Sequence, residues 1–178
     1  RSVPPPRTIE ALATRMPSGD ARVRVETYTM QGGQRQYVVY VAGTDMTRTT
    51  PFDNISNGQL AAGQRSASYD AVLQALREAG AEPGDVVHAV GHSQGAMITS
   101  HLALEGGYVT RTRVSFGPAV DADAPAAVPR VVLRHTDDPV PTLAAGGHAQ
   151  TVGAPGSVTV ERDASAAPGA ALGSHDMG

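Results

Sequence analysis

The sequence has no cysteine, no tryptophan and no lysine, and two of these absences remove a class of chemistry. Without cysteine there is neither a disulfide nor a thiolate metal ligand. Without lysine no side-chain amine can form a Schiff base. Only 17% of the 178 residues are charged, and the net charge is −3. The arginines are scattered and do not form the clustered basic surface that phosphate binding needs, so we expect no nucleic-acid partner.

Long apolar runs are also missing. No segment approaches the ~18 apolar residues of a membrane span. No charged segment followed by an apolar one opens the chain, so we expect neither a transmembrane helix nor a signal peptide within it. The chain starts at Arg1, which favours a processed or excised segment. Localisation stays open, secretion included, and so does the oligomeric state.

The length and the 40% hydrophobic content suit one compact domain with a core of its own. Residues 1–19 are proline-rich, which predicts a linker or N-terminal extension, with one short helical turn around Leu12. Residues 20–178 are predicted to form the domain, with truncation at its C-terminus left open. We see no internal repeat in the sequence.

Strand-like and helix-like patterns alternate along the domain. Residues 22–29 and 36–42 flank a Gly-Gly turn and predict a hairpin, and residues 43–65 are predicted to be a loop. A helix is expected from Ser66, with Tyr69, Val72, Leu73 and Leu76 on its core face and Gly80 as its C-terminal cap. Further elements are expected in order: strand 85–90, helix 94–105, and strands 112–116, 130–135 and 158–162. This order predicts an α/β fold, with a mostly parallel sheet, an N-terminal hairpin and flanking helices.

The pentapeptide at residues 91–95, Gly-His-Ser-Gln-Gly, lies between a predicted strand and a predicted helix. In that context a serine stands on a tight turn with its hydroxyl exposed, as a nucleophile does. The glycines allow the turn its strained backbone. Since the chain has 20 glycines, the pentapeptide alone can arise by chance, so the flanking elements carry the prediction.

A serine nucleophile needs a histidine base and a carboxylate that orients the histidine. In α/β hydrolases the order along the chain is Ser, acid, His. After Ser93, the pair Asp137 and Asp138 directly follows a predicted strand, so either carboxylate lies on the same rim of the sheet as the serine. Two histidines lie beyond them. We predict His175 as the base and keep His148 as the reserve.

The chain resembles the α/β-hydrolase superfamily, and its motifs are most similar to those of class 3 (fungal-type) lipases. The pair Gln94 and Ala96 makes the turn around the serine cutinase-like. Four segments carry the resemblance in order: the strand ending in Gly-Thr at 39–44, the elbow at 91–95, Ser-Phe-Gly-Pro at 115–118 and Asp-Pro-Val-Pro at 138–141.

The resemblance implies a fold and roles for five residues. The fold would be an α/β-hydrolase-like sheet. Ser93 would be the nucleophile, Asp138 the acid and His175 the base. The backbone N–H groups of Thr44 and Gln94 would form the oxyanion hole. The implied activity is that of a serine hydrolase of the lipase or esterase type, cleaving a small-molecule or lipid ester through an acyl-enzyme without metal or cofactor.

Other functions stay open on the sequence. The same triad could serve an acyltransferase or a thioesterase. The fold could also be a non-catalytic binding or toxin-associated module. His88 and His92 are four residues apart, but on a strand and its following turn they cannot converge on a metal. Asp121 and Asp123 are expected to be solvated loop carboxylates.

Overall fold

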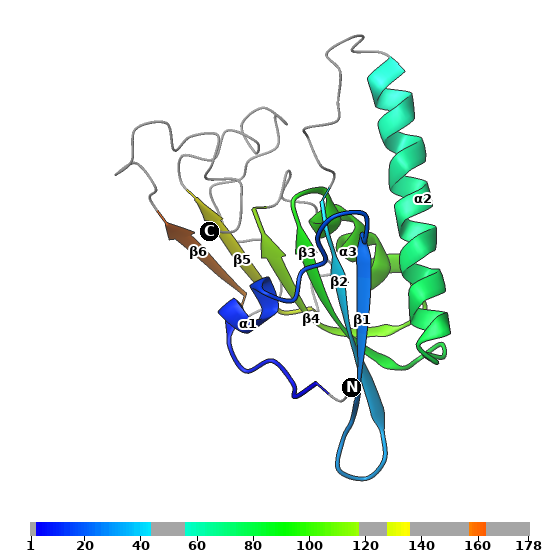
Figure 1. Ribbon diagram of the computed structural model, residues 1–178, viewed down its shortest axis with the longest axis vertical. Helices are drawn as coiled ribbons and strands as arrows, with labels where there is room; N and C mark the ends of the chain where they lie inside the picture. Colours follow the sequence, from blue (N-terminus) through cyan, green and yellow to red (C-terminus); the bar gives the residue numbers. More distant parts are fainter. Residues whose placement is uncertain (1–2, 44–55, 118–127, 136–156, 163–178) are drawn as a thin grey trace.

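A six-stranded sheet forms the centre of the computed structural model, which describes residues 3–43, 56–117, 128–135 and 157–162 (Figure 1). The elements, in chain order, are α1 (Ile9–Ala13), β1 (Val23–Thr29), β2 (Arg35–Val41), α2 (Ser56–Glu78), β3 (Val86–His92), α3 (Gln94–Glu105), β4 (Val109–Phe116), β5 (Arg130–His135) and β6 (Val158–Arg162). The predicted α/β class with a mostly parallel sheet is confirmed. No helix in the described ranges is long and apolar enough to cross a membrane.

The order of the strands in the sheet is the order of the strands in the chain. β1 and β2 form the predicted antiparallel hairpin, with Val23 opposite Val41. Its turn contains Gly32 and Gly33, both at positive φ, which costs glycine little. The pairs from β2 to β6 are parallel. The carboxyl ends of β2 to β6 therefore meet at one rim.

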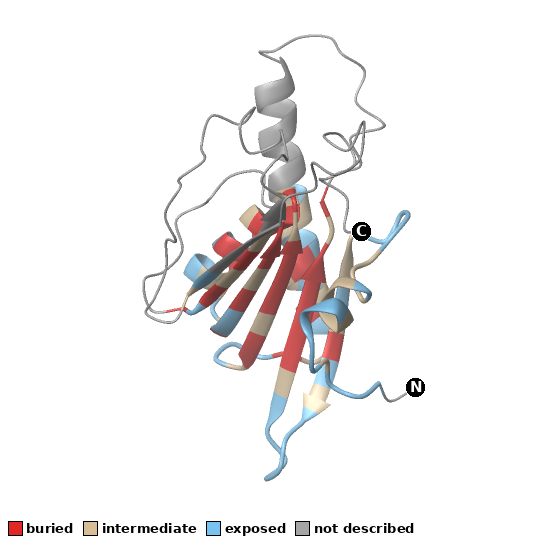
Figure 2. Ribbon diagram, turned by 90° about the vertical axis from the view of Figure 1, so that its left-hand side faces the viewer, coloured by how far each residue is buried: buried red, intermediate tan, exposed pale blue. Residues whose placement is uncertain are grey.

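Helices α2 and α3 cover one face of the sheet, and α1 covers part of the other (Figure 2). The alternation of strand side chains divides the core into two layers. The layer under α2 and α3 is formed by Tyr37, Val39, Val41, Val72, Leu76, Ala81, Val87, Ala89, Ile98 and Leu102. The layer on the α1 face is formed by Val38, Tyr40, Val90 and Phe116, with Leu12, Ala13 and Met16 of the N-terminal segment packed against it.

The predicted core face of α2 is confirmed. Val72 and Leu76 are fully buried, and Tyr69 and Leu73 pack against the same cluster. The predicted cap is confirmed as well, because Gly80 has φ +86° and the N–H of Ala81 donates to the carbonyl of Leu76 at 2.9 Å. This is the six-to-one hydrogen bond of a helix ending at a left-handed glycine.

Two predicted boundaries are wrong. Helix α2 begins at Ser56, so ten residues of the predicted loop 43–65 are helical. Those residues include two glycines and no apolar stripe, but the alanines, glutamines and leucine among them favour a helix, and an existing helix extends at little cost. Strand β4 begins at Val109 instead of Thr112, because its first residues pair with Val86 and Val87 of β3.

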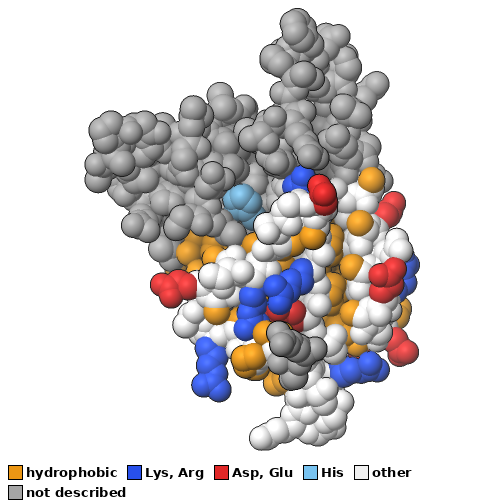
Figure 3. Space-filling model, viewed as in Figure 1, with side chains coloured by type: hydrophobic (Ala, Val, Ile, Leu, Met, Phe, Trp, Pro, Cys, Tyr) orange, Lys and Arg blue, Asp and Glu red, His pale blue; other side chains and the backbone are white. Residues whose placement is uncertain are grey.

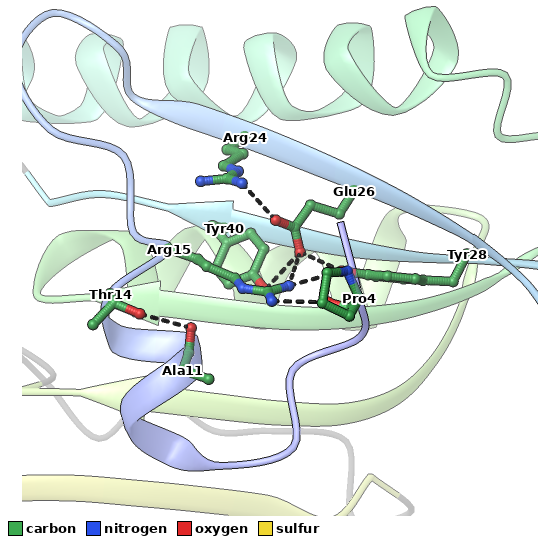
Figure 4. A network of polar contacts seen from close by, with 8 residues as sticks. All are labelled: Pro4, Ala11, Thr14, Arg15, Arg24, Glu26, Tyr28 and Tyr40. Carbon is green, nitrogen blue, oxygen red and sulfur yellow. Dashed lines mark hydrogen bonds and ion pairs between the residues drawn. The ribbon is translucent and has the colours of Figure 1, made fainter. Parts of the chain in front are cut away.

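A buried carboxylate links the N-terminal segment to the hairpin (Figure 4). Glu26 is 8% exposed and accepts hydrogen bonds from Tyr28 at 2.7 Å, Tyr40 at 2.9 Å and Arg15 at 3.0 Å, while Arg24 lies 2.7 Å from its other oxygen. Burial alone would raise the pKa of Glu26, but the hydrogen bonds from the tyrosines and Arg15 outweigh it and lower the pKa. Figure 3 shows basic and acidic side chains gathered at the centre of this face, among hydrophobic ones.

Candidate active site

Ser93 stands on the turn between β3 and α3, as the sequence predicts. Its backbone has φ 52° and ψ −122°. Among the described residues it is the one non-glycine residue with positive φ. This backbone conformation is strained for an L-residue. Such strain persists where the surrounding structure enforces it, and it is common at functional sites. The strand, strained serine and helix together form the geometry of a nucleophile elbow.

The two flanking glycines are required by close backbone contacts. A Cβ on Gly91 would lie 2.6 Å from both the N and Cα of Ala96. A Cβ on Gly95 would lie 2.8 Å from the carbonyl carbon of Val41 and closer still to its oxygen. Each glycine thus lets α3 start directly against the sheet, which forces the sharp reversal at Ser93.

Hydrogen bonds hold Ser93 at the rim of the sheet. Its N–H donates to the carbonyl of Phe116 at 3.0 Å, and its carbonyl accepts from the N–H of Ala96 at 3.1 Å. Ser93 is 5% exposed, so the structure does not show the exposed hydroxyl that the sequence predicts. The end of β2 is close beside it, because a Cβ built on Gly43 would lie 2.7 Å from Ser93 Cβ and 3.4 Å from Ser93 Oγ. Only glycine at position 43 lets the two segments approach so closely.

Gln94 is the first residue of α3. The N–H groups in the first turn of an α-helix have no acceptor within the helix, and the helix dipole makes this end positive. A negative charge that develops next to Ser93 would therefore lie in a favourable field. The structure brings Gly43 close to Ser93, which Gln94 directly follows in the chain.

Arg22, which the sequence did not single out, belongs to this group. Its Nη1 donates to the carbonyl of Gly43 at 2.6 Å, and its own carbonyl accepts from the N–H of Ala42 at 2.9 Å. The hairpin register explains the contact, because Val23 pairs with Val41 and the next pair is Arg22 with Ala42. The sequence held a signal for this contact, the Gly-Gly turn. Counting paired residues outward from that turn along both strands places Arg22 near the end of β2.

A cavity of about 310 Å³ opens beside Gly43 and Gln94, between the ends of β1 and β2 and the helices α2 and α3. The described residues that line it are mostly small or aliphatic, with one charged residue among them, Arg22. Ala67 and Ala71 line the α2 side, and Ile98 lines the α3 side. The cavity is of the size and polarity that suit a small apolar group next to a few polar ones.

The remaining predicted site residues lie outside the described residues. These are the oxyanion residue Thr44, the acids Asp137 and Asp138, the bases His148 and His175, and the loop carboxylates Asp121 and Asp123. The structure therefore brings together Ser93, Gln94 and the glycine that precedes Thr44, and the triad stays a prediction.

His88 has structural partners on its own sheet. One ring nitrogen contacts Thr112 Oγ1 and the other lies 3.1 Å from Gln36 Oε1. Burial, and then the charge of Arg111, lowers the pKa of His88. His92 stands four residues further along β3, and at ~3.3 Å per residue the two rings are too far apart to share a metal ion. Within the described part of the chain, no group of three His, Asp or Glu side chains could hold a metal.

A scan against protein-family models finds no match, and a search of curated protein sequences finds none either. The geometry around Ser93 is therefore the basis for a functional assignment.

Proposed function

We propose that the chain is a serine hydrolase that cleaves carboxylic esters through an acyl-enzyme on Ser93, on an α/β-hydrolase-like fold. The observation that carries the proposal is the backbone of Ser93, at φ 52° and ψ −122° between a parallel strand and a helix. Strain of this kind at one serine, enforced by two glycines that accept no Cβ, supports a nucleophile more than a structural turn.

In the proposed mechanism His175 takes the proton of Ser93 as Oγ attacks the acyl carbon, and Asp138 orients the imidazole. The tetrahedral oxyanion accepts hydrogen bonds from the backbone N–H groups of Gln94 and Thr44. His175 then gives its proton to the departing alcohol, and water repeats the sequence to release the acid. In other enzymes, removing one oxyanion-hole donor raises the activation free energy by about 3–4 kcal/mol.

Arg22 acts in this proposal as a positioning residue. The carbonyl of Gly43 and the N–H of Thr44 belong to one peptide unit, which is planar and trans, so fixing the carbonyl fixes the direction of the N–H. The charged hydrogen bond from Arg22 to that carbonyl, at 2.6 Å, holds the unit and polarises it. The adjoining cavity of about 310 Å³ would take a part of the substrate next to the reacting carbonyl.

The experiment is labelling by a fluorophosphonate probe, combined with hydrolysis of short p-nitrophenyl esters. We expect both in the wild type and neither in Ser93→Ala. Ser115→Ala is the matched control, because Ser115 is a buried serine on the neighbouring strand, 2% exposed, and should keep full labelling. Labelling that persists in Ser93→Ala would exclude Ser93 as the nucleophile.

The same assay separates the alternative functions. If added alcohols are strongly preferred over water as the acyl acceptor, the reaction is acyl transfer on the same serine. If CoA esters are strongly preferred as the acyl donor, the reaction is thioester cleavage on that serine. If a folded chain that includes His175 reacts with neither probe nor ester, the hydrolase proposal is wrong and a binding module remains.

A further inference from the structure

A second cavity, of about 290 Å³, lies on the face of the sheet that α2 and α3 do not cover. On the sheet side it is lined by Val38 of β2, Val90 of β3 and Val114 of β4, which belong to or pack against the core layer on the α1 face. The residue before Val114, Arg113, faces the other way, because its Nη2 contacts Ser100 Oγ on α3. This cavity and the one that adjoins the elbow therefore lie on opposite faces of the sheet.

The N-terminal segment forms the outer wall of this cavity. Arg15 holds the segment on the sheet, because its Nη1 lies 3.0 Å from Glu26 Oε2 and its Nη2 donates to the carbonyl of Pro4 at 2.8 Å (Figure 4). The residues of the segment that line the cavity are Pro5, Pro6 and Leu12. The cavity is thus apolar on the sheet side and on the outer side, and apolar cavities of this kind stay dry and take up small apolar molecules.

A hydrogen-bonded row of polar side chains crosses this apolar lining. Gln36, His88 and Thr112 lie on the neighbouring strands β2, β3 and β4, and all of them line the cavity. One ring nitrogen of His88, Nδ1, contacts Thr112 Oγ1, and the other, Nε2, lies 3.1 Å from Gln36 Oε1. Because an amide oxygen can only accept, Nε2 carries the proton and Nδ1 accepts from the hydroxyl. The amide NH2 of Gln36 has no acceptor among the described residues, so it is the donor left for a ligand.

The described lining of the cavity carries no charge at neutral pH. Among the described residues that line it there is no Asp, Glu or Arg. Burial, and then the charge of Arg111, lowers the pKa of His88, so its imidazole is neutral at pH 7. A charged ligand would lose its hydration in the cavity without gaining a counter-charge. The lining therefore favours a ligand without charge.

We propose that this cavity binds a small uncharged molecule with an apolar body and one oxygen that accepts a hydrogen bond. The apolar body lies between Val90 and Val114 on the sheet side and the N-terminal segment on the other, and the oxygen accepts from the amide of Gln36. Pockets for small molecules typically combine an apolar lining with a few polar groups that fix the orientation of the ligand. The volume, about 290 Å³, is at the lower end of their range, which excludes a large ligand.

Acetophenone is the test ligand, because it has an aromatic body, one carbonyl oxygen and no charge. α-Methylstyrene has nearly the same shape with a CH2 group in place of the oxygen, and benzoate has a negative charge. Titration of the full chain, followed by nuclear magnetic resonance, measures the three Kd values. We expect saturable binding of acetophenone and α-methylstyrene, and binding of benzoate that is weaker by a factor of about ten or more. Nuclear Overhauser effects should connect acetophenone to the methyl groups of Val90 and Val114.

The variant Gln36→Leu tests the hydrogen bond to the ligand. It should weaken the binding of acetophenone about fivefold and should not weaken that of α-methylstyrene, because it removes one neutral hydrogen bond. Gln74→Leu is the matched control, since Gln74 is an exposed glutamine on α2, on the other face of the sheet. It should change neither Kd.

Three results would overturn the proposal: no saturable binding of either uncharged molecule, Overhauser effects to Ile98 of the other cavity instead of Val90 and Val114, or an equal loss of both molecules in Gln36→Leu. Benzoate that binds as tightly as acetophenone would exclude an uncharged ligand. If Gln36→Leu does not fold, the Overhauser effects and the comparison with benzoate decide on the wild type alone. None of these readouts depends on whether Ser93 is a nucleophile, since acetophenone has no ester bond.

Discussion

Replacing Ser93 by glycine should stabilise the protein relative to replacing it by alanine, because only glycine relieves the backbone strain. At φ 52° and ψ −122° the residue lies outside the left-handed helical region, so the strain falls in the upper part of the range, about 2–3 kcal/mol. Against this gain, glycine destabilises the folded state by about 0.5–1 kcal/mol relative to alanine, because the unfolded chain with glycine has more conformational entropy. Loss of the buried Cβ lowers the stability of the glycine variant by about 0.8 kcal/mol more. The net gain for Ser93→Gly over Ser93→Ala is about 0.2–1.7 kcal/mol.

Urea denaturation followed by circular dichroism measures this difference. For an m-value of about 2 kcal/mol/M, a gain of about 1 kcal/mol moves the midpoint up by about 0.5 M. The same pair of substitutions at Ser115, a strand residue with ordinary φ, is the control and should give the opposite sign. A Ser93→Gly midpoint at or below that of Ser93→Ala would show that the turn stores no strain and would remove the main support for the nucleophile.

Three further predictions concern the elbow and the hairpin. Gly95→Ala places a Cβ 2.8 Å from the carbonyl carbon of Val41, so α3 must move off β2 and the free energy of unfolding should fall by about 1–3 kcal/mol in urea. Arg22→Met frees the Gly43 carbonyl and should lower kcat on p-nitrophenyl esters about tenfold with little change in KM, because the positioned peptide acts on the transition state. Glu26→Gln should lower the free energy of unfolding by about 1–3 kcal/mol at pH 7, since it removes the charge that accepts the hydrogen bonds of Arg15 and the two tyrosines in a partly buried site. Because the pKa of Glu26 is lowered, its wild-type contribution is present above about pH 4.3 and is lost as pH falls through the lowered pKa, whereas the variant should lack this step.

Each of these predictions has a clear contrary result. A Gly95→Ala variant with wild-type stability would mean that α3 does not rest on β2 as described. An Arg22→Met variant that changes KM alone would indicate a substrate contact instead of a positioning role. A Glu26→Gln variant whose stability falls with acid as steeply as the wild type would show that another carboxylate dominates acid unfolding.

The strands and the elbow could be predicted from local pattern. The buried strands β2 and β3 are apolar runs bounded by turn residues, and the Gly-x-Ser-x-Gly turn lies between a strand and a helix in both sequence and structure. The first ten residues of α2, 56–65, could not be predicted as helix, because they carry no apolar stripe. They are helical because the helix formed by the segment after them extends through them.

The contacts of Glu26, Arg22 and Arg113 could not be predicted either, for a different reason. The alternation in β1 correctly directs Val23 and Val25 to the helix-covered face, but it suggests that Glu26 faces water. Glu26 is buried because a distant segment, the N-terminal turn with Arg15, lies on it. Arg22 and Arg113 likewise acquire their environment from strand pairing and from α3, which periodicity within one segment does not encode.

The agreement between strand order and chain order has a consequence for biosynthesis. As the chain leaves the ribosome at about 5–20 residues per second, each new strand meets the edge of a sheet that already exists. The hairpin forms first, and each later strand is added on its β2 side. The bond from Ser93 to Phe116 then fixes the strained turn as soon as β4 has docked. We therefore expect the conformation of Ser93 to be set during translation, while the last third of the chain is still being made.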